Sequence, residues 1–266
     1  MEPMKSIAMM LLLATAQVFA AANAEPEIYT ATTTGELTVD AEGRVTSVAL
    51  DPKSLGADLV QDFESQMRAW AFEPILKDGQ PVPAKARLSV GLLVIRQPGA
   101  ENMRIGFERV QFFEPVARKA AEGVSRSLAP PAYPESELRD GIGARVDLLL
   151  RLDAEGRVTD AAAETVNLFG EPEPRLRERH GRNFSKSAVR ATARWRIPGI
   201  EGGVVVVPVT FMPGGVDSNR WIRTHGVAVE TPAWVTAERA SSGAIALDAS
   251  GARPSERWKL VTPIGG

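Results

Sequence analysis

The chain of 266 residues contains no cysteine. This absence excludes disulfide bridges, thiol chemistry and the attachment of a lipid through an N-terminal cysteine. The fold must therefore be held together by packing of the apolar residues, which make up 44% of the chain. Because the chain is longer than an average domain of roughly 100 to 150 residues, we expect two modules.

The chain also lacks an excess of either charge sign. Lysine and arginine number 31, aspartate and glutamate number 33, and the formal net charge is −2. A protein that binds nucleic acid or an anionic membrane surface usually carries a basic patch that dominates its charge. We therefore expect neither of these among the partners.

Residues that carry out catalysis are scarce. The only histidines are His180 and His225. His180 lies among Arg177, Arg179 and Arg182, whose charge disfavours protonation and metal binding, so we predict a solvated loop residue there. No serine lies in a Gly-x-Ser-x-Gly elbow, and no glycines form a phosphate loop. The sequence predicts a binding protein and not an enzyme, with no catalytic residue, no cofactor and no metal.

Two interpretations are open for the basic cluster formed by Arg175, Arg177, Arg179 and Arg182. One is contact with an acidic partner or with anionic cell-wall material. The other is a solvated loop linked by ion pairs, because Glu171, Glu173 and Glu178 neutralise much of the charge. We predict the ion-paired loop.

The only long apolar run lies at the N-terminus. Lys5 precedes the run from Ile7 to Ala14, and Ala22-Asn23-Ala24 matches the small-residue pattern of a signal-peptidase site. This predicts a cleaved signal peptide over residues 1–24 and a periplasmic mature protein. The alternative is an uncleaved inner-membrane anchor over residues 7–22, because this stretch approaches the roughly 20 residues that span a bilayer.

A seven-residue repeat divides the remainder of the chain. Asp40 to Thr46 recurs without change as Asp153 to Thr159. Each copy lies between stretches of alternating apolar residues, which indicates a β-hairpin. Within the turn, the aspartate can accept hydrogen bonds from the backbone while Gly43 or Gly156 takes a positive φ angle.

An apolar helical face that ends in tryptophan follows each hairpin. Its members are spaced by three or four residues: Leu55, Leu59, Phe63, Met67 and Trp70 in the first unit, and Phe184, Ala188, Ala191 and Trp195 in the second. We predict that both tryptophans are buried core anchors. We predict Asn183 as the N-cap of the second helix, and Pro74 and Pro198 as helix stops.

Each unit closes with a glycine-led strand. The first covers Leu88 to Val94 and the second covers Val204 to Phe211. The second unit is longer between hairpin and tryptophan, and we place the insertion as a surface loop over residues 169–181. The expected segments are a signal peptide (1–24), a first module (25–98), a linker with a short helix (99–128), a second module (129–214) and a tail or extra hairpin (215–266).

The second unit resembles the TonB C-terminal domain family. The matching motifs are an opening Tyr-Pro pair, a glycine turn and a segment that resembles the Trp-x-Phe-x-Pro signature of the family, with Ile197 in the place of phenylalanine. They are carried by Tyr133, Pro134, Gly141, Gly143, Trp195 and Pro198. The first unit matches more loosely and lacks the Tyr-Pro opening, although its segment from Trp70 to Pro74 is the better match to the signature. The resemblance implies an α+β fold of two modules, each with a small antiparallel sheet packed by one main helix.

The resemblance also implies a function. The family grips outer-membrane transporters by β-augmentation, in which an extended partner segment pairs with an exposed edge strand. The matching strand here supplies Val204, Val205, Val206, Val207, Val209 and Phe211. Pro208 has no backbone N–H and is confined to an edge or a bulge, whereas a valine run is also typical of a buried strand.

We therefore expect a periplasmic TonB-like adaptor that binds protein partners of the cell envelope, with outer-membrane transporters as one class. Pairing of edge strands between two copies of the chain would give a homodimer. Two alternatives stay open: an envelope-assembly module that binds cell-wall polymer, and a membrane-anchored energy transducer if the N-terminus is not cleaved.

Overall fold

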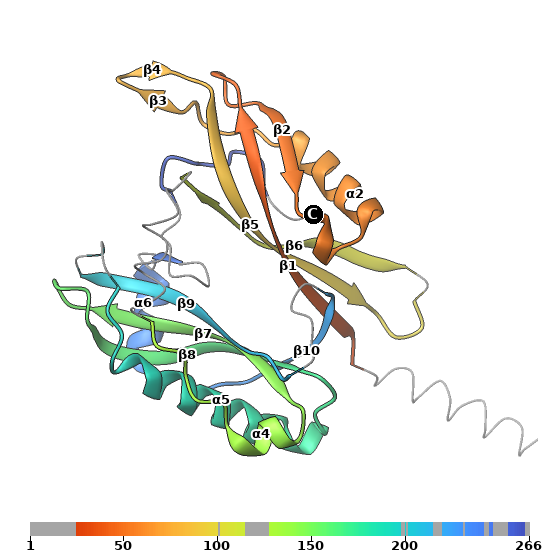
Figure 1. The fold of residues 1–266 in the computed structure, drawn as a ribbon, viewed down its shortest axis with the longest axis vertical. Coiled ribbons are helices and arrows are strands. Elements are labelled where there is room, and N and C mark those ends of the chain that lie inside the picture. Colours follow the sequence, from red (N-terminus) through yellow and green to blue (C-terminus); the bar gives the residue numbers. More distant parts are fainter. Residues whose placement is uncertain are drawn as a thin grey trace, which may run out of the picture.

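The structure is a computed structural model that describes residues 25–100, 102–114, 128–197, 200, 202–214, 220–230, 232–241, 245–246 and 255–263. The predicted signal peptide lies outside these residues, and so do residues 116–127, where a short helix was expected. The described chain has a mixed α+β fold, dominated by an antiparallel sheet and containing a few helices (Figure 1). This confirms the expected fold class.

The described chain divides into an N-terminal half, in the upper part of Figure 1, and a C-terminal half, in the lower part. The N-terminal half contains β1 (Glu27–Val39), β2 (Val45–Leu50), η1 (Pro52–Ser54), α2 (Ala57–Arg68), β3 (Leu76–Lys77), β4 (Gln80–Pro81), β5 (Ala84–Arg96) and β6 (Met103–Phe113). The C-terminal half contains α4 (Glu135–Arg139), β7 (Gly143–Leu152), β8 (Val158–Phe169), η2 (Pro174–Leu176), α5 (Arg177–Thr192), β9 (Gly203–Phe211), β10 (Ile222–Val227), α6 (Ala233–Ser241) and β11 (Ile245–Ala246).

The main strands form one continuous sheet and not the two separate small sheets that we expected. Its order is β11-β9-β7-β8-β10-β1-β5-β6, with β2 paired to β1. All pairings within it are antiparallel except that of β11 with β9. The joining strand is β10, which pairs with β8 through Thr224 to Val227 and with β1 through Ile222 to Thr224.

Two of the predicted boundaries differ from the observed elements. Residues 99–128 were expected to form a linker, but Met103–Phe113 forms β6 and pairs with β5. The segment after residue 214 was expected to be a tail or an extra hairpin. It supplies β10, which pairs with strands of both halves, and α6 and β11, which pack on the C-terminal half.

The repeated hairpin has the predicted turn. In the first copy, Asp40 Oδ1 accepts hydrogen bonds from the backbone N–H groups of Glu42 and Arg44, at 3.0 and 2.9 Å. The hydrogen bonds from Arg44 lower the pKa of Asp40. Gly43 has a φ of 83°, in the left-handed region that favours glycine.

The turn also holds the segment that follows the helix. The backbone N–H of Phe72 donates to the carbonyl of Gly43 at 2.9 Å, and that of Ile197 donates to Gly156 at 2.8 Å. A β-carbon on either glycine would collide with the carbonyl oxygen of its partner residue. The seven-residue repeat therefore encodes the same hairpin-to-helix junction twice.

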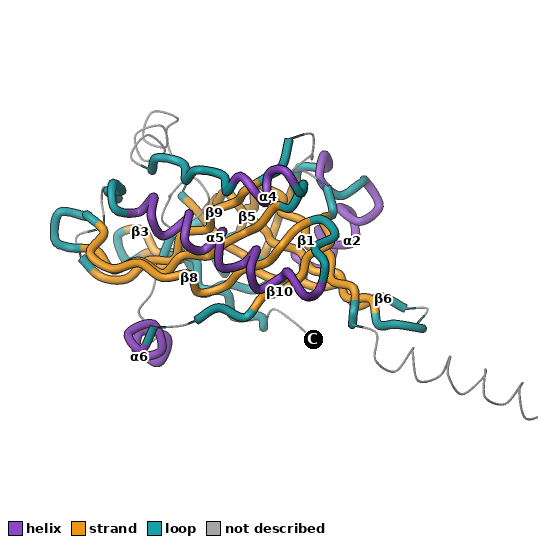
Figure 2. The backbone as a smooth tube through the Cα atoms, turned by 90° about the horizontal axis from the view of Figure 1, so that it is seen from below, coloured by secondary structure: helices purple, strands orange, loops and turns teal. Residues whose placement is uncertain are grey.

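Each helix buries its predicted face on one half of the sheet. Trp70 and Trp195 are 5% and 4% exposed, which confirms both as core residues. Phe63 and Phe184 lie at the centres of two separate apolar clusters. Figure 2, seen from below, shows α5 and α4 in front of the strands of the C-terminal half.

The predicted start of the second helix is wrong. Helix α5 begins at Arg177 after the η2 turn, so Asn183 lies inside the helix and does not cap it. The extra residues of the second unit lengthen the strand and the helix: β8 has 12 residues and β2 has 6, and α5 has 16 residues and α2 has 12. Of the predicted surface loop, only residues 170–176 lie outside β8 and α5. Among the described residues, no helix is long and apolar enough to cross a membrane.

Candidate functional site

Strand β9, the predicted partner-binding strand, lies near one end of the sheet. Its inner edge pairs with β7 along its whole length, from Leu152 opposite Gly203 to Ala144 opposite Phe211. Within the described residues, its outer edge pairs with β11 at Val205 and Val206. In the described part of the chain, no strand pairs with the outer edge from Val207 to Phe211.

The side chains of β9 do not face a partner. Val205, Val207, Val209 and Phe211 are buried against α5. Val204 and Val206 pack with Trp234 and Val235 of α6 on the opposite face. The strand is thus both a buried valine strand and an edge strand, and it offers backbone groups to a partner.

The N-terminal half has the same arrangement of strands, but the outer edge of its closing strand is paired with a further strand. Strand β1 is the central strand, paired with β2 of the hairpin and with the closing strand β5, as β7 is paired with β8 and β9. The outer edge of β5 pairs with β6 from Arg87 to Arg96. The two closing strands therefore differ in how much of the outer edge the described chain covers.

The motif residues of the second unit fix its opening segment to the core. The hydroxyl of Tyr133 donates to the carbonyl of Ile142 at 2.7 Å, and its ring contacts Phe184 and Phe211 at centroid distances of 5.8 and 5.7 Å. Burial, and then the charge of Glu137, raises the pKa of Tyr133 to about 12.

The remaining motif residues also have structural roles. Pro134 precedes α4 as its N-cap residue, and Gly141 has a φ of 68°. A β-carbon on Gly143 would lie 2.6 Å from the carbonyl oxygen of Phe211, so glycine permits close approach to β9. The indole of Trp195 donates to Ala129 at 2.8 Å. Pro198 lies outside the described residues.

A buried polar cluster, which the sequence analysis missed, joins α4 to α5. His180 Nδ1 lies 3.0 Å from Glu137 Oε1, which also accepts a hydrogen bond from Asn183 at 2.8 Å. Ser136 donates to the other carboxylate oxygen at 2.6 Å. Burial alone would raise the pKa of Glu137, but the hydrogen bonds from Ser136, Asn183 and His180 together lower it.

This cluster corrects the prediction that His180 is a solvated loop residue. His180 and Glu137 are 2% and 0% exposed, so neither side chain reaches a substrate, and the cluster positions α4 on α5. Phe184 and Ala188 lie four residues apart on the buried face of α5. His180 lies four residues before Phe184, so the same helical spacing predicts that His180 is buried.

The arginine-rich segment is ion-paired, as predicted, although much of it lies on a helix. Arg175 pairs with Glu173 at 2.8 Å, and Arg182 lies 3.6 Å from Glu178. Glu171 pairs instead with Arg223 of β10.

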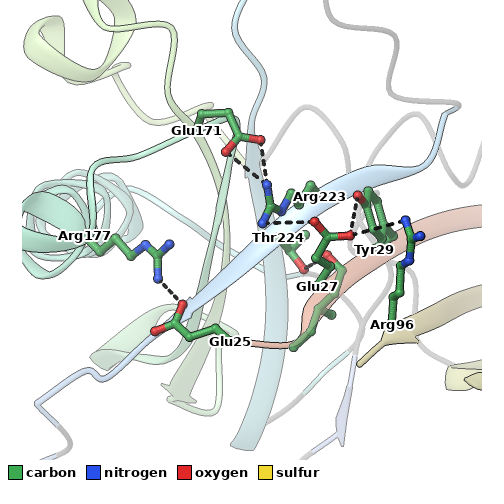
Figure 3. Close-up of polar contacts among 9 residues, drawn as sticks. Glu25, Glu27, Tyr29, Arg96, Glu171, Arg177, Arg223 and Thr224 are labelled. Atoms are coloured by element: carbon green, nitrogen blue, oxygen red, sulfur yellow. Dashed lines mark hydrogen bonds and ion pairs between the residues drawn. The ribbon is translucent and has the colours of Figure 1, made fainter. Parts of the chain in front are cut away.

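Further ion pairs surround β10 where the two halves of the sheet meet (Figure 3). Arg223 lies 3.2 Å from Glu171 and 3.5 Å from Glu27, and Arg177 lies 2.7 Å from Glu25. These pairs connect β10 and α5 with the first described residues of the chain. Because most of the side chains are partly exposed, each pair adds little stability.

A second candidate site is a cleft between the two halves of the sheet, on the faces opposite α2 and α5. Its volume is about 340 Å³, within the range of small-molecule sites. Asp147 of β7 lies beside it and binds two arginines, Arg109 of β6 and Arg145 of β7, each at 3.2 Å. Burial would raise the pKa of Asp147, but these two charges and a hydrogen bond from Thr165 lower it, so the carboxylate stays ionised.

The cleft contains none of the usual metal-binding sets. Among the described residues, no group of three or more histidine, aspartate or glutamate side chains is placed to hold a metal ion. Neither a scan against protein-family models nor searches of curated proteins and of solved structures finds a match to this chain.

Proposed function

We propose that this protein is a periplasmic TonB-like adaptor that binds protein partners of the cell envelope through the outer edge of β9. In this proposal the two hairpin–helix–strand units are two TonB C-terminal-like modules, and the second is the binding module. Outer-membrane transporters are the partner class. The protein acts by binding and not by catalysis.

One observation carries the proposal: equivalent edges of the two units are covered to different extents. In the first unit, β6 pairs antiparallel with the edge of β5 over most of its length. In the second unit, among the described residues, β11 covers Val205 and Val206 alone. The stretch from Val207 to Phe211 is about as long as a short strand, ~5 residues, and β6 demonstrates that this type of edge accepts an added strand.

Backbone pairing explains why a binding strand can have buried side chains. In β-augmentation, main-chain hydrogen bonds provide most of the affinity, and side chains add selectivity. Pro208 has no N–H to donate, so one position on β9 forms one hydrogen bond fewer. We expect the partner strand to pair best on either side of this position.

Cross-linking tests this proposal directly, because the chain has no cysteine of its own. The variant Thr210→Cys places a thiol at an exposed position of β9. We expect it to form a disulfide with cysteine-bearing synthetic peptides taken from the periplasmic segments of outer-membrane transporters, since facing residues of paired strands have β-carbons ~5 Å apart. Mass spectrometry of the unreduced protein measures the capture.

The matched control is Ser89→Cys, on the equivalent strand β5, whose edge β6 already covers. This variant should capture little peptide. Peptides with alternate backbone nitrogens methylated should also fail, because they cannot donate to the strand. Equal capture by both variants, or no capture by Thr210→Cys above that of methylated peptides, contradicts the proposal.

A further inference from the structure

The cleft between the two halves of the sheet contains more positive charge than its structural role requires. Three arginines line it: Arg109 of β6, Arg145 of β7 and Arg220. The one acidic residue in its lining is Asp51, whose carboxylate already accepts a hydrogen bond from the backbone of Lys53 at 3.1 Å. A single ion pair would be enough to link the halves.

The two inner arginines share one carboxylate. Arg109 uses Nη2 and Arg145 uses Nε to bind opposite oxygens of Asp147. Among the described residues, these are the only side-chain hydrogen bonds of either guanidinium. A guanidinium has five N–H donors, so most of them remain available on the side of the cleft. One carboxylate also leaves one of the two positive charges uncompensated.

The remainder of the lining is divided by chemical character. Hydroxyl groups come from Thr34, Ser89 and Thr210. Apolar surface comes from Phe169 and Met212, together with Pro208 and Ile222. A ligand that matches this lining has both an anionic group and an apolar body.

We propose that the cleft binds a small organic anion, whose carboxylate or phosphate group is held by Arg109 and Arg145 and whose body lies against Phe169 and Met212. Planar guanidinium groups bind both kinds of oxyanion through paired N–H donors. The ligand contacts strands of both halves, so its binding also strengthens the association of the halves. The cleft shares Pro208 and Thr210 with β9, but the anion is held by arginines and not by the backbone of the strand edge, so this site does not depend on the proposed adaptor function.

Calorimetric titration of the mature chain tests the site with three probes. Benzoate carries a carboxylate, phenyl phosphate carries a phosphate, and benzyl alcohol has a similar apolar body without charge. We expect saturable binding of one or both anions and none of the alcohol. The stronger of the two anions identifies the kind of group that the site prefers.

Two variants shift the affinity in opposite directions if the arginines hold the anion. Arg145→Lys keeps the ion pair with Asp147 but removes the planar fork, and should weaken binding about tenfold, the equivalent of one charge-assisted hydrogen bond. Asp147→Asn removes the competing carboxylate and should strengthen binding. General damage to the cleft would weaken binding in both variants.

Two exposed arginines, one in the lining of the cleft and one outside it, serve as a test variant and its control. Arg220→Gln should weaken binding a few-fold, because an exposed charge pair contributes little. Arg179→Gln, on α5 outside the cleft, should leave binding unchanged. The proposal is overturned if the unmodified protein binds neither anion, or if both Arg145→Lys and Asp147→Asn weaken binding while each remains folded by circular dichroism.

Discussion

His225 lies on β10 in a position that favours its neutral form. Burial, and then the charges of Arg177 and Arg223, lowers the pKa of His225, and Glu171 and the backbone of Gly170 offset this only in part. In the described chain, the Nε2 atom is buried and has no hydrogen-bond partner. A proton there would thus add charge beside two arginines.

The lowered pKa predicts how stability depends on pH. The folded protein binds fewer protons at His225 than the unfolded chain, whose histidines titrate near ~6.5, so stability is highest above that pH and decreases as the pH falls through and below it. We expect His225→Gln to reduce the decrease in unfolding free energy between about pH 7.5 and about pH 5.5. Urea unfolding at the two pH values measures this. Since His180 remains in both proteins, equal decreases would contradict the prediction.

At the scale of single elements, the hairpin turn has a testable requirement for glycine. Gly156 has a positive φ, and a β-carbon on it would collide with the carbonyl oxygen of Ile197. Gly56 also has a positive φ, of 81°, but a β-carbon there would have no neighbour within 4 Å. Both alanine variants carry backbone strain of about 1 kcal/mol, and Gly156→Ala carries a collision in addition.

We therefore expect Gly156→Ala to lower the free energy of unfolding by more than Gly56→Ala does, by at least about 1 kcal/mol. Gly43→Ala should resemble Gly156→Ala, because the first hairpin makes the same contact with Phe72. Denaturant unfolding of the three variants measures the order. A Gly56→Ala variant as unstable as the other two would show that φ strain alone matters.

The elements that the sequence predicted are those whose signals are local. Alternating residues around Asp40 and Asp153 predicted the hairpins, and steps of three and four residues predicted the buried faces that end in Trp70 and Trp195. The start of α5 was misplaced because arginines and glutamates dominate its first turn, and that composition is also typical of a loop. His180 was misjudged for the same reason.

Pairings between distant segments left no such signal. Strand β6 and strand β10 each join the sheet through backbone hydrogen bonds, which any sequence can make, so their places in the order were not predicted. The valine strand β9 was predicted, but how much of its edge is covered depends on residues 245 and 246. The cleft brings Arg109 beside Asp147 from the other half of the chain, and only the folded structure reveals that contact.

At the scale of the whole molecule, the end of the chain completes the core of its beginning. Trp258 is 7% exposed and belongs to the apolar cluster of the N-terminal half. Its ring stacks on Phe112 at 5.9 Å and meets Phe72 edge-on at 5.5 Å. The N-terminal half therefore includes residues that follow the C-terminal half in the sequence.

We expect Trp258→Ala to lower the free energy of unfolding by about 3 to 5 kcal/mol, as for other large-to-small core changes. Trp234→Ala, at a partly buried tryptophan beside Arg151, should have a smaller effect. Urea unfolding compares the two. A change within about 0.5 kcal/mol for Trp258→Ala would show that the last segment is not part of this core.

The position of β10 between β8 and β1 has a consequence for the order in which the molecule is completed. Strand β10 lies far along the chain from β1. During synthesis β1 can pair early with β2 and β5, while its other side, from Ile28 to Thr30, waits for β10. During that interval the N-terminal half has one short open strand edge, and the place of Trp258 in its core is unfilled, a condition that favours pairing with other chains. The segment from β10 to Trp258 therefore completes the N-terminal half, and a chain truncated before Ile222 would lack both the strand pairing and the core tryptophan.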